Sequence, residues 1–323
     1  MPSPAVALTK LSIRDFRGIE SLDLDFLGPD GKPNQLVVLS GPNGSGKTTV
    51  LEAALIVAGG HVQAVGPRDW TAVRRGAGGY RIVGLFRNEA GEEKSQGCFP
   101  GEALIAPFGI TSWYFPSSRS SRPIGSLDIT VGKYAPADKI KESLLRSIKQ
   151  RLVNEAAKAR FRPASQDSSS FYDRTIERIS NYWRQFYPDS KAYFEVDFAE
   201  GPPGPEPGIF DVFLVLADHH RLEVDYLSSG QLEIFLFLAS LTLNGDREGI
   251  VFIDEPELHL DPQWHRLVLR ILTDLQPRTQ FLVATHSPEV YDAARSYERH
   301  YLAPADDPRA KLWHPVATSE AGV

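Results

Sequence analysis

Hydrophobic and polar positions alternate at the start of the chain and predict two strands within residues 6–27, joined around Arg17-Gly18-Ile19. The apolar run 36–39, a Gly-rich segment and the apolar sequence 50–55 then predict a strand, a loop and a helix. Apolar residues also recur at helical spacing over 140–152. Further helices are predicted over 172–186, 231–243 and 262–275, and further strands over 80–86, 110–115, 193–198, 209–216, 221–225, 249–254 and 280–285. Strands that alternate with helices indicate a largely parallel sheet.

The composition is that of a soluble globular protein with a sizeable core. Of the 323 residues, 42% are hydrophobic and 24% are charged, and no apolar run approaches the ~20 residues that cross a bilayer. Cys98 is the single cysteine, which excludes an internal disulfide and a cysteine-based zinc site. Since residues 1–5 also lack the basic start and apolar stretch of a secretory signal, we expect a cytoplasmic protein without membrane contact.

The segment between the strand at 36–39 and the helix at 50–55 fits the P-loop pattern G-x-x-x-x-G-K-[ST]. Glycines let successive backbone N–H groups face one anion, and the helix N-terminus adds partial positive charge. A Gly-rich turn that happens to contain Lys-Thr is the simpler alternative, but the flanking strand and helix favour a phosphate site. The candidate nucleotide-binding residues are Gly41, Pro42, Asn43, Gly44, Ser45, Gly46, Lys47, Thr48 and Thr49.

A second candidate segment is the strand at 249–254, which ends in Asp254-Glu255. Four apolar residues followed by this pair resemble a Walker B strand, in which the Asp holds Mg²⁺ and the following Glu polarises the attacking water. Acidic residues also occur at the exposed ends of ordinary buried strands, so the pair alone decides nothing. Together with the P-loop, it predicts Thr48 and Asp254 as magnesium ligands and Glu255 as general base.

Three further motifs narrow the class. Leu227-Ser228-Ser229-Gly230-Gln231 resembles an ABC-type signature, Leu258-His259-Leu260-Asp261 resembles a D-loop, and Thr285-His286-Ser287 lies where that class carries its switch histidine. Each motif alone is weak, but the order matches ABC-type ATPases in full. Two further segments, Phe16-Arg17-Gly18-Ile19 and Asp254-Glu255-Pro256-Glu257, make the resemblance more specific. With these motifs the chain resembles the RecF/SMC/OLD-like branch, most closely the stand-alone AAA-family ATPases related to OLD proteins.

This resemblance covers residues 8–60 and 225–292. It implies an α/β ABC-type ATPase head in which an inserted helical signature lobe joins a mixed or parallel Walker core. We expect one domain over 1–323, with the nucleotide-binding core in 1–115 and 225–323 and the inserted lobe in 116–224. Gln63 and Gln96 are the candidates for the Q-loop. Because few residues follow Ser287, we expect no Toprim nuclease domain of the kind that full OLD proteins carry, and we expect no long coiled coil.

The resemblance also implies a head-to-tail homodimer that sandwiches two Mg²⁺–ATP groups. In that arrangement Ser228, Ser229 and Gly230 of one copy meet the phosphates held by the P-loop of the other, near the D-loop residue Asp261. Lys47 would bind the phosphates, Glu255 would act as base and His286 would sense the γ-phosphate. Small residues suit the signature because they let donors approach a phosphate closely.

Two functions follow from the resemblance. The first is an ATPase that dimerises on ATP and gates a separate effector protein, a nuclease or toxin, in bacterial anti-phage defence. The second is a RecF-like ATPase that grips DNA in repair or recombination. A local excess of basic residues over 138–162 could contact DNA or a partner, although a solvated helix face is the simpler interpretation. The net charge of −6 means that any DNA contact must come from such a patch.

Overall fold

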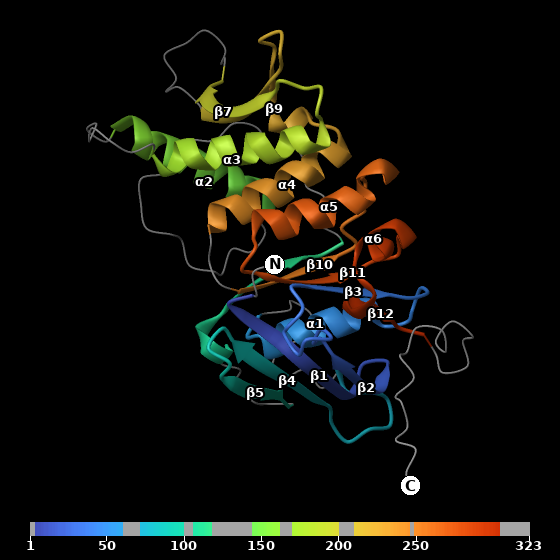
Figure 1. Cartoon of the computed structure of the whole chain (residues 1–323). Coiled ribbons are helices and arrows are strands. Elements are labelled where there is room, and N and C mark those ends of the chain that lie inside the picture. The colour runs from blue at the N-terminus through green and yellow to red at the C-terminus, as the bar shows by residue number, and fades with distance from the viewer. Residues whose placement is uncertain are drawn as a thin grey trace. The chain divides into compact units, whose positions relative to one another are not determined.

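The computed structural model describes residues 4–60, 72–99, 106–117, 144–161, 170–199, 210–245 and 249–303 (Figure 1). Its strands are β1 (Val6–Phe16), β2 (Ile19–Asp25), β3 (Leu36–Ser40), β4 (Arg81–Asn88), β5 (Glu93–Cys98), β6 (Thr111–Phe115), β7 (Tyr193–Phe198), β8 (Phe210–Val215), β9 (Arg221–Glu223), β10 (Gly249–Asp254), β11 (Gln280–Ala284) and β12 (Arg299–Tyr301). Its α-helices are α1 (Lys47–Val57), α2 (Leu144–Phe161), α3 (Phe171–Phe186), α4 (Ser229–Asn244), α5 (Pro262–Leu275) and α6 (Pro288–Ala293). Within these residues, no helix has the length and hydropathy that a membrane crossing requires.

The chain forms two compact units. The first comprises Met1–Ser117, Arg247–Glu257 and Val268–Val323, and the second comprises Ser118–Asp246 and Leu258–Leu267. The signature helix α4 therefore belongs to the second unit, whereas the expected boundary at residue 224 assigned it to the nucleotide-binding core. The physical reason is that α4 packs against α2 and α3, which precede it in the chain.

The parallel sheet of the first unit determines where functional residues can meet. Its strand order is β12-β3-β11-β10-β6, and every neighbouring pair is parallel. The carboxyl ends of all five strands therefore lie at one edge, which is where α/β sheets bind ligands. β3 leads into the P-loop, β10 ends at Asp254, and β11 leads to Thr285. The strands β3, β10 and β11 are apolar and almost fully buried, as expected for a sheet covered on both faces.

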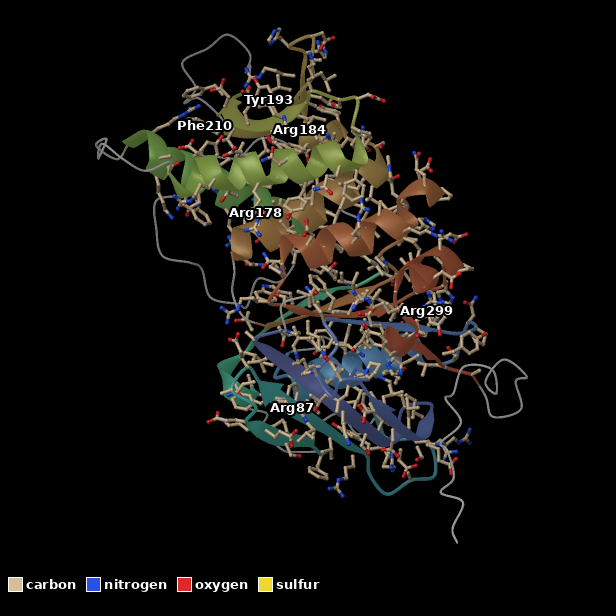
Figure 2. The ribbon with its side chains drawn as sticks, in the orientation of Figure 1. Arg87, Arg178, Arg184, Tyr193, Phe210 and Arg299 are labelled. Atoms are coloured by element: carbon tan, nitrogen blue, oxygen red, sulfur yellow. The ribbon has the colours of Figure 1, made fainter. Side chains whose placement is uncertain are left out.

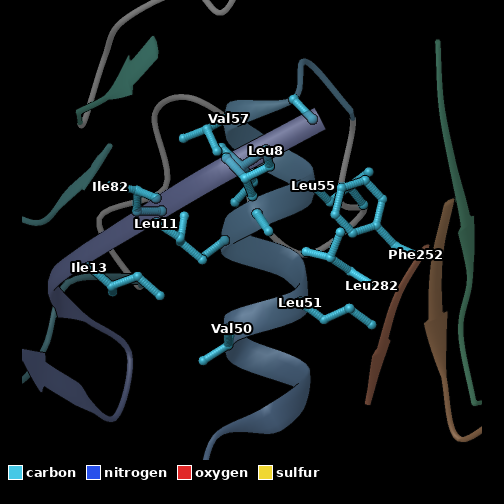
Figure 3. Packing of buried hydrophobic residues seen from close by; sticks show 14 of the residues in the cluster. Leu8, Leu11, Ile13, Val50, Leu51, Leu55, Val57, Ile82, Phe252 and Leu282 are labelled. Atoms are coloured by element: carbon cyan, nitrogen blue, oxygen red, sulfur yellow. The ribbon is translucent and has the colours of Figure 1, made fainter. Parts of the chain in front are cut away.

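Helix α1 packs between this sheet and an antiparallel sheet of order β2-β1-β4-β5. Figure 3 shows Leu8 and Leu11 of β1 on one side of the helix and Phe252 and Leu282 of the parallel sheet on the other. From Val50 to Val57 every position of α1 is buried and all but Glu52 are apolar, because this part of the helix contacts protein on two sides. This burial fixes the helix whose first turn closes the P-loop.

The second unit contains helices and the antiparallel sheet β7-β8-β9. Helix α3 is amphipathic, and its buried Trp183 meets Phe194 of β7 with ring centroids 5.0 Å apart. Phe194 in turn contacts Phe235 of the signature helix at 5.0 Å. Figure 2 marks this unit by Arg178 and Arg184 on α3 and by Tyr193 at the start of β7. The signature helix thus rests on an aromatic core supplied by α3 and β7.

Most predicted elements are present with bounds that differ by a few residues. The strand 249–254 and the helix 262–275 have the predicted bounds. Of the described strands and α-helices, β5, α6 and β12 were not predicted. β5 reads Glu-Lys-Ser-Gln-Gly-Cys and lies at a sheet edge, so its pairing with β4 rather than an apolar pattern defines it. The other two are short, and β12 exists because it pairs with β3.

Candidate nucleotide site

The P-loop connects β3 to α1 through three glycines with positive φ. Gly44 and Gly46 adopt φ values of 78° and 92°, and Gly46 is the residue that precedes the helix. Such angles cost other residues free energy, which explains glycine at both positions. Gly41 is constrained by space as well, because a Cβ there would lie 2.0 Å from the carbonyl oxygen of Leu302. The loop therefore has the backbone geometry that presents N–H groups to an anion at a helix N-terminus.

Lys47 is the first residue of α1 and is only 5% exposed. Its Nζ donates to the carbonyl oxygens of Gly41 at 2.9 Å and Pro42 at 3.0 Å, so the side chain lies across the loop. Burial lowers the pKa of this ammonium, and the carboxylates of Asp254, Glu255 and Glu257 oppose that shift. The lysine thus lies close to the Walker B carboxylates, where a phosphate would satisfy its charge.

Thr48 and Asp254, the two predicted magnesium ligands, are brought together. The Thr48 Oγ1 donates to Asp254 Oδ2 at 2.9 Å although the residues lie 206 positions apart. Neighbouring ligands of an octahedral Mg²⁺ with bonds of about 2.1 Å are about 3 Å apart, so this pair of oxygens fits adjacent coordination positions. Asp254 is 4% exposed, which suits a carboxylate whose charge a cation would balance. The donor set therefore fits magnesium.

Glu255 and His286 also meet, with 3.5 Å between His286 Nε2 and Glu255 Oε1. Glu255 has a φ of 52°, an unfavourable angle for a residue with a side chain, and its N–H donates to the carbonyl of Ala284 at 2.8 Å. Strained backbone of this kind concentrates at functional sites. A cavity of about 470 Å³ has residues 40–43 and His286 in its lining, so the start of the P-loop and the switch histidine open onto the same space.

The signature sequence starts α4 in the second unit. Ser228 is the N-cap, and it forms a capping box with Gln231 in which each side chain accepts from the other residue's backbone N–H. Gly230 is required by contact, since a Cβ at this residue would lie 2.6 Å from the carbonyl oxygen of His259 in the D-loop. Asp261, the other predicted residue of this unit, accepts from the Gln263 N–H at 3.0 Å and so caps α5.

Other sequence predictions find less support. Gln63 lies outside the described residues, and Gln96 lies in β5, where its side chain donates to the Gly97 carbonyl. In the basic segment, residues 138–143 and 162 also lie outside the described part of the chain. Lys149 was assigned to a basic surface, but it is wholly buried and ion-paired with Asp211 and Asp225. This buried position is a correction to the surface interpretation.

Three further basic side chains of α2 also form contacts within the second unit. Arg151 donates to Asn244 and to the Leu243 carbonyl, Lys158 pairs with Glu155, and Arg160 pairs with Asp197. These contacts within the unit reduce the charge available for a nucleic-acid backbone. They favour the interpretation of this helix as part of the fold rather than as a DNA surface.

Two contacts near the motifs were not predicted. Arg17 forms an ion pair with Glu52 on α1 and has a φ of 50°, which ties the turn between β1 and β2 to the P-loop helix. Tyr187, at the end of α3, lies near Gln231, and burial raises the pKa of its hydroxyl to about 12. Only the Phe-Arg-Gly-Ile resemblance signalled the first contact, and no local sequence pattern signalled the second.

Comparison with protein families places the motifs in a known group. Residues 135–292 match the family described as "AAA domain, putative AbiEii toxin, Type IV TA system", and residues 10–96 match a second family described as "AAA domain". The two matches include the P-loop, signature, Walker B and switch segments described above. Both matched families are AAA domains, so these two parts of the chain are similar to AAA-family P-loop ATPase domains. The predicted recognition of this group is therefore confirmed.

Curated relatives agree with this assignment. The Septu protein PtuA of Bacillus mycoides (strain KBAB4) is 22% identical over 305 residues, covering 87% of this chain and 38% of the relative. A protein of Vibrio cholerae serotype O1 biovar El Tor named "Retron Vc95 probable ATPase" is 40% identical over 75 residues, covering 23% of this chain and 14% of that protein. The chain thus spans about two fifths or less of the length of these relatives.

Among solved structures, the SMC head bound to the C-terminal winged-helix domain of ScpA is similar with a TM-score of 0.53 and 15% identity. The similarity covers 89% of this chain and 91% of that one. At this level of identity the likeness shows the fold alone. It confirms the predicted ABC-type ATPase head.

Proposed function

We propose that this chain binds Mg²⁺–ATP and hydrolyses it between two copies of itself. The observation that carries the proposal is the cluster at the carboxyl edge of the parallel sheet, where Lys47, Thr48, Asp254, Glu255 and His286 meet around the P-loop. Phosphoryl transfer to water needs positioned charge and an oriented nucleophile more than covalent catalysis. Lys47, Thr48 and Asp254 would position the charge, and Glu255 and His286 would orient the attacking water and the phosphate.

The roles follow from the contacts. The P-loop N–H groups and Lys47 would hold the phosphates, while Thr48 and Asp254 would hold the metal, which supplies charge neutralisation when bound. Glu255 would accept a proton from the attacking water, and the hydrogen bond from its N–H to the Ala284 carbonyl holds its backbone beside β11. His286, 3.5 Å from Glu255, would donate to the phosphate that is being transferred.

The ATP sandwich is the finer part of the proposal. The signature residues Ser228, Ser229 and Gly230 lie at the start of a helix, where the partial positive charge of the helix dipole favours an anion. They belong to a different unit from the P-loop, as expected if each serves the nucleotide held by a second copy. A variant that binds ATP without hydrolysing it tests the ATP sandwich directly, because it should stay in the dimeric state. Glu255→Gln should bind ATP, dimerise and hydrolyse ATP at least about a hundredfold more slowly than the wild type. Near-normal hydrolysis by this variant would rule out the assigned base.

The cellular role we propose is control of a partner effector in bacterial defence against phage. The similarity to a Septu protein and to a retron ATPase supports this choice over DNA repair. The engaged basic side chains of α2 also favour it over a DNA clamp. The test is to purify the native protein and, separately, the Glu255→Gln variant in the presence of ATP, and to identify the proteins that co-purify by mass spectrometry. A co-purifying nuclease or toxin would support it, and purification with DNA alone would contradict it.

A further inference from the structure

One carboxylate oxygen holds the segment that carries the switch histidine. Glu257 Oε1 accepts three hydrogen bonds from consecutive residues after β11, namely from Thr285 Oγ1 at 2.7 Å, His286 N at 2.8 Å and Ser287 N at 3.1 Å. Two of the donors are backbone N–H groups, so the carboxylate fixes the path of the main chain as well as a side chain. Glu257 belongs to the motif Asp254-Glu255-Pro256-Glu257, and the sequence alone indicated no role for it.

The surroundings stabilise these three hydrogen bonds to Glu257, which we call the Glu257 bracket. Thr285 is fully buried, and Glu257 Oε2 is buried without a hydrogen bond from the described residues. A carboxylate withdrawn from water in this way is tolerated when strong donors compensate it, and hydrogen bonds to an ionised acceptor are the strongest class. On the far side of His286, Ser287 caps α6 by accepting from the Val290 N–H at 3.2 Å. The backbone of residue 286 is therefore fixed on both sides.

The imidazole itself is less constrained. Its side chain is 38% exposed, opens onto the cavity beside the P-loop, and lies 3.5 Å from Glu255. A rigid backbone that carries a partly exposed side chain suits a group that must contact a ligand at a defined place. Residues 254–257 supply the predicted magnesium ligand Asp254, the base Glu255 and the hydrogen-bond acceptor Glu257. These three groups therefore lie on one short piece of backbone.

We propose that Glu257 is the positioning residue of the switch histidine, holding His286 where it can contact the transferred phosphate. This inference rests on the proposed ATP hydrolysis. Glu257 acts through the backbone of residues 285–287 and needs no contact with the nucleotide. Its loss should therefore reduce turnover while leaving ATP binding to the P-loop unchanged.

Kinetics of matched variants test the assignment. Glu257→Ala removes the acceptor and should lower kcat at least about tenfold, the effect expected from losing a bond to a charged group. The affinity for a fluorescent ATP analogue should stay within about twofold, since Lys47 and the P-loop keep their contacts. Glu257→Gln retains an acceptor oxygen and should recover most of the loss. Glu89→Ala, which removes an exposed carboxylate paired with Arg278, is the control and should match the wild type.

A double-mutant comparison separates positioning from general stability. If Glu257 acts through His286, Glu257→Ala should slow a His286→Ala protein by less than about twofold further. Thr285→Val removes one of the three donors and should cause a smaller loss than Glu257→Ala, which keeps the test available if the alanine variant folds poorly. Hydrogen exchange gives an activity-free readout, because the amides of His286 and Ser287 should exchange faster in Glu257→Ala.

The outcomes are distinct. A wild type that binds ATP and never hydrolyses it, alone or with a partner, would overturn the proposed function. Normal turnover by Glu257→Ala, or full additivity with His286→Ala, would overturn the positioning role alone. Unchanged exchange of the two amides would overturn the bracket itself.

Discussion

Replacing Lys149 by methionine is the substitution that should perturb the signature unit most. The ammonium of Lys149 is fully buried, lies 2.7 Å from Asp211 Oδ1 and also contacts Asp225. Carboxylate oxygens of Asp211, Glu223 and Asp225 lie within 4.8 Å of one another, and the lysine pairs with two of these three acids. Asp225 precedes the signature serine Ser228 by three residues. The variant would leave Asp211 and Asp225 without the positive charge that pairs with them.

The expected cost is large compared with the stability of a domain. Removing one partner of a buried ion pair costs about 3–5 kcal/mol because it leaves an uncompensated charge. Methionine retains the length and apolar stem of lysine, so little of this loss would come from a cavity. Since a domain is stable by about 5–15 kcal/mol, the variant should lose a substantial fraction of its free energy of unfolding.

Urea unfolding measures this loss. With a slope of about 1–3 kcal/mol per molar urea, the midpoint of Lys149→Met should fall by at least about 1 M. Lys158→Met is the matched control on the same helix, because Lys158 is 60% exposed and its pair with Glu155 is worth at most about 1 kcal/mol. Adding Asp211→Asn and Asp225→Asn to Lys149→Met should recover part of the loss by removing the stranded charges. Equal midpoints for Lys149→Met and Lys158→Met would refute the reasoning.

Three further predictions concern the same units. Burial and the neighbouring Asp211 and Asp225 raise the pKa of Glu223 above its ordinary value of 4.5. The protonated carboxyl therefore stabilises the fold below pH 4.5, and this stabilisation is lost as the pH rises through the folded-state pKa. Glu223→Gln, which stays uncharged, should raise the unfolding free energy at pH 7, and its difference from the wild type should shrink toward pH 4. Gly230→Ala gains about 1 kcal/mol of helix propensity, but its Cβ would meet the His259 carbonyl at 2.6 Å. An overpacking cost of about 1–3 kcal/mol should outweigh that gain, so the melting temperature should fall. Thr48→Val should raise the Mg²⁺ concentration needed for half-maximal ATP hydrolysis at least about tenfold, and an unchanged requirement would contradict its role as a ligand.

Local patterns in the sequence were sufficient for much of the fold. β10 is an apolar run that ends in two acids, and α5 has an apolar stripe at helical spacing, so both could be predicted with their bounds. β5 and β12 could not, because a polar edge strand and a three-residue strand exist only through pairing with β4 and β3. Their signal lies in the partner strand rather than in their own residues.

The candidate site divides in the same way. Motif spacing located Lys47, Thr48, Asp254 and Glu255, and a parallel sheet brings the ends of such strands together. The Glu257 bracket was not foreseen, because its donors lie 28 to 30 positions away in another loop. Lys149 was misplaced for a similar reason, since the acids that bury it belong to β8 and to the segment after β9.

The central claim is that each nucleotide site takes its P-loop from one copy and its signature from another. Mixing two inactive variants tests it most directly, with Lys47→Ala lacking a working P-loop and Ser229→Arg lacking a working signature. Each variant alone should show no ATP hydrolysis, whereas a one-to-one mixture should regain turnover, because its mixed dimers hold one complete site. A protein that carries both substitutions in one chain should stay inactive when mixed with either variant. A mixture as inactive as its components, at concentrations where the wild type hydrolyses ATP, would contradict the account.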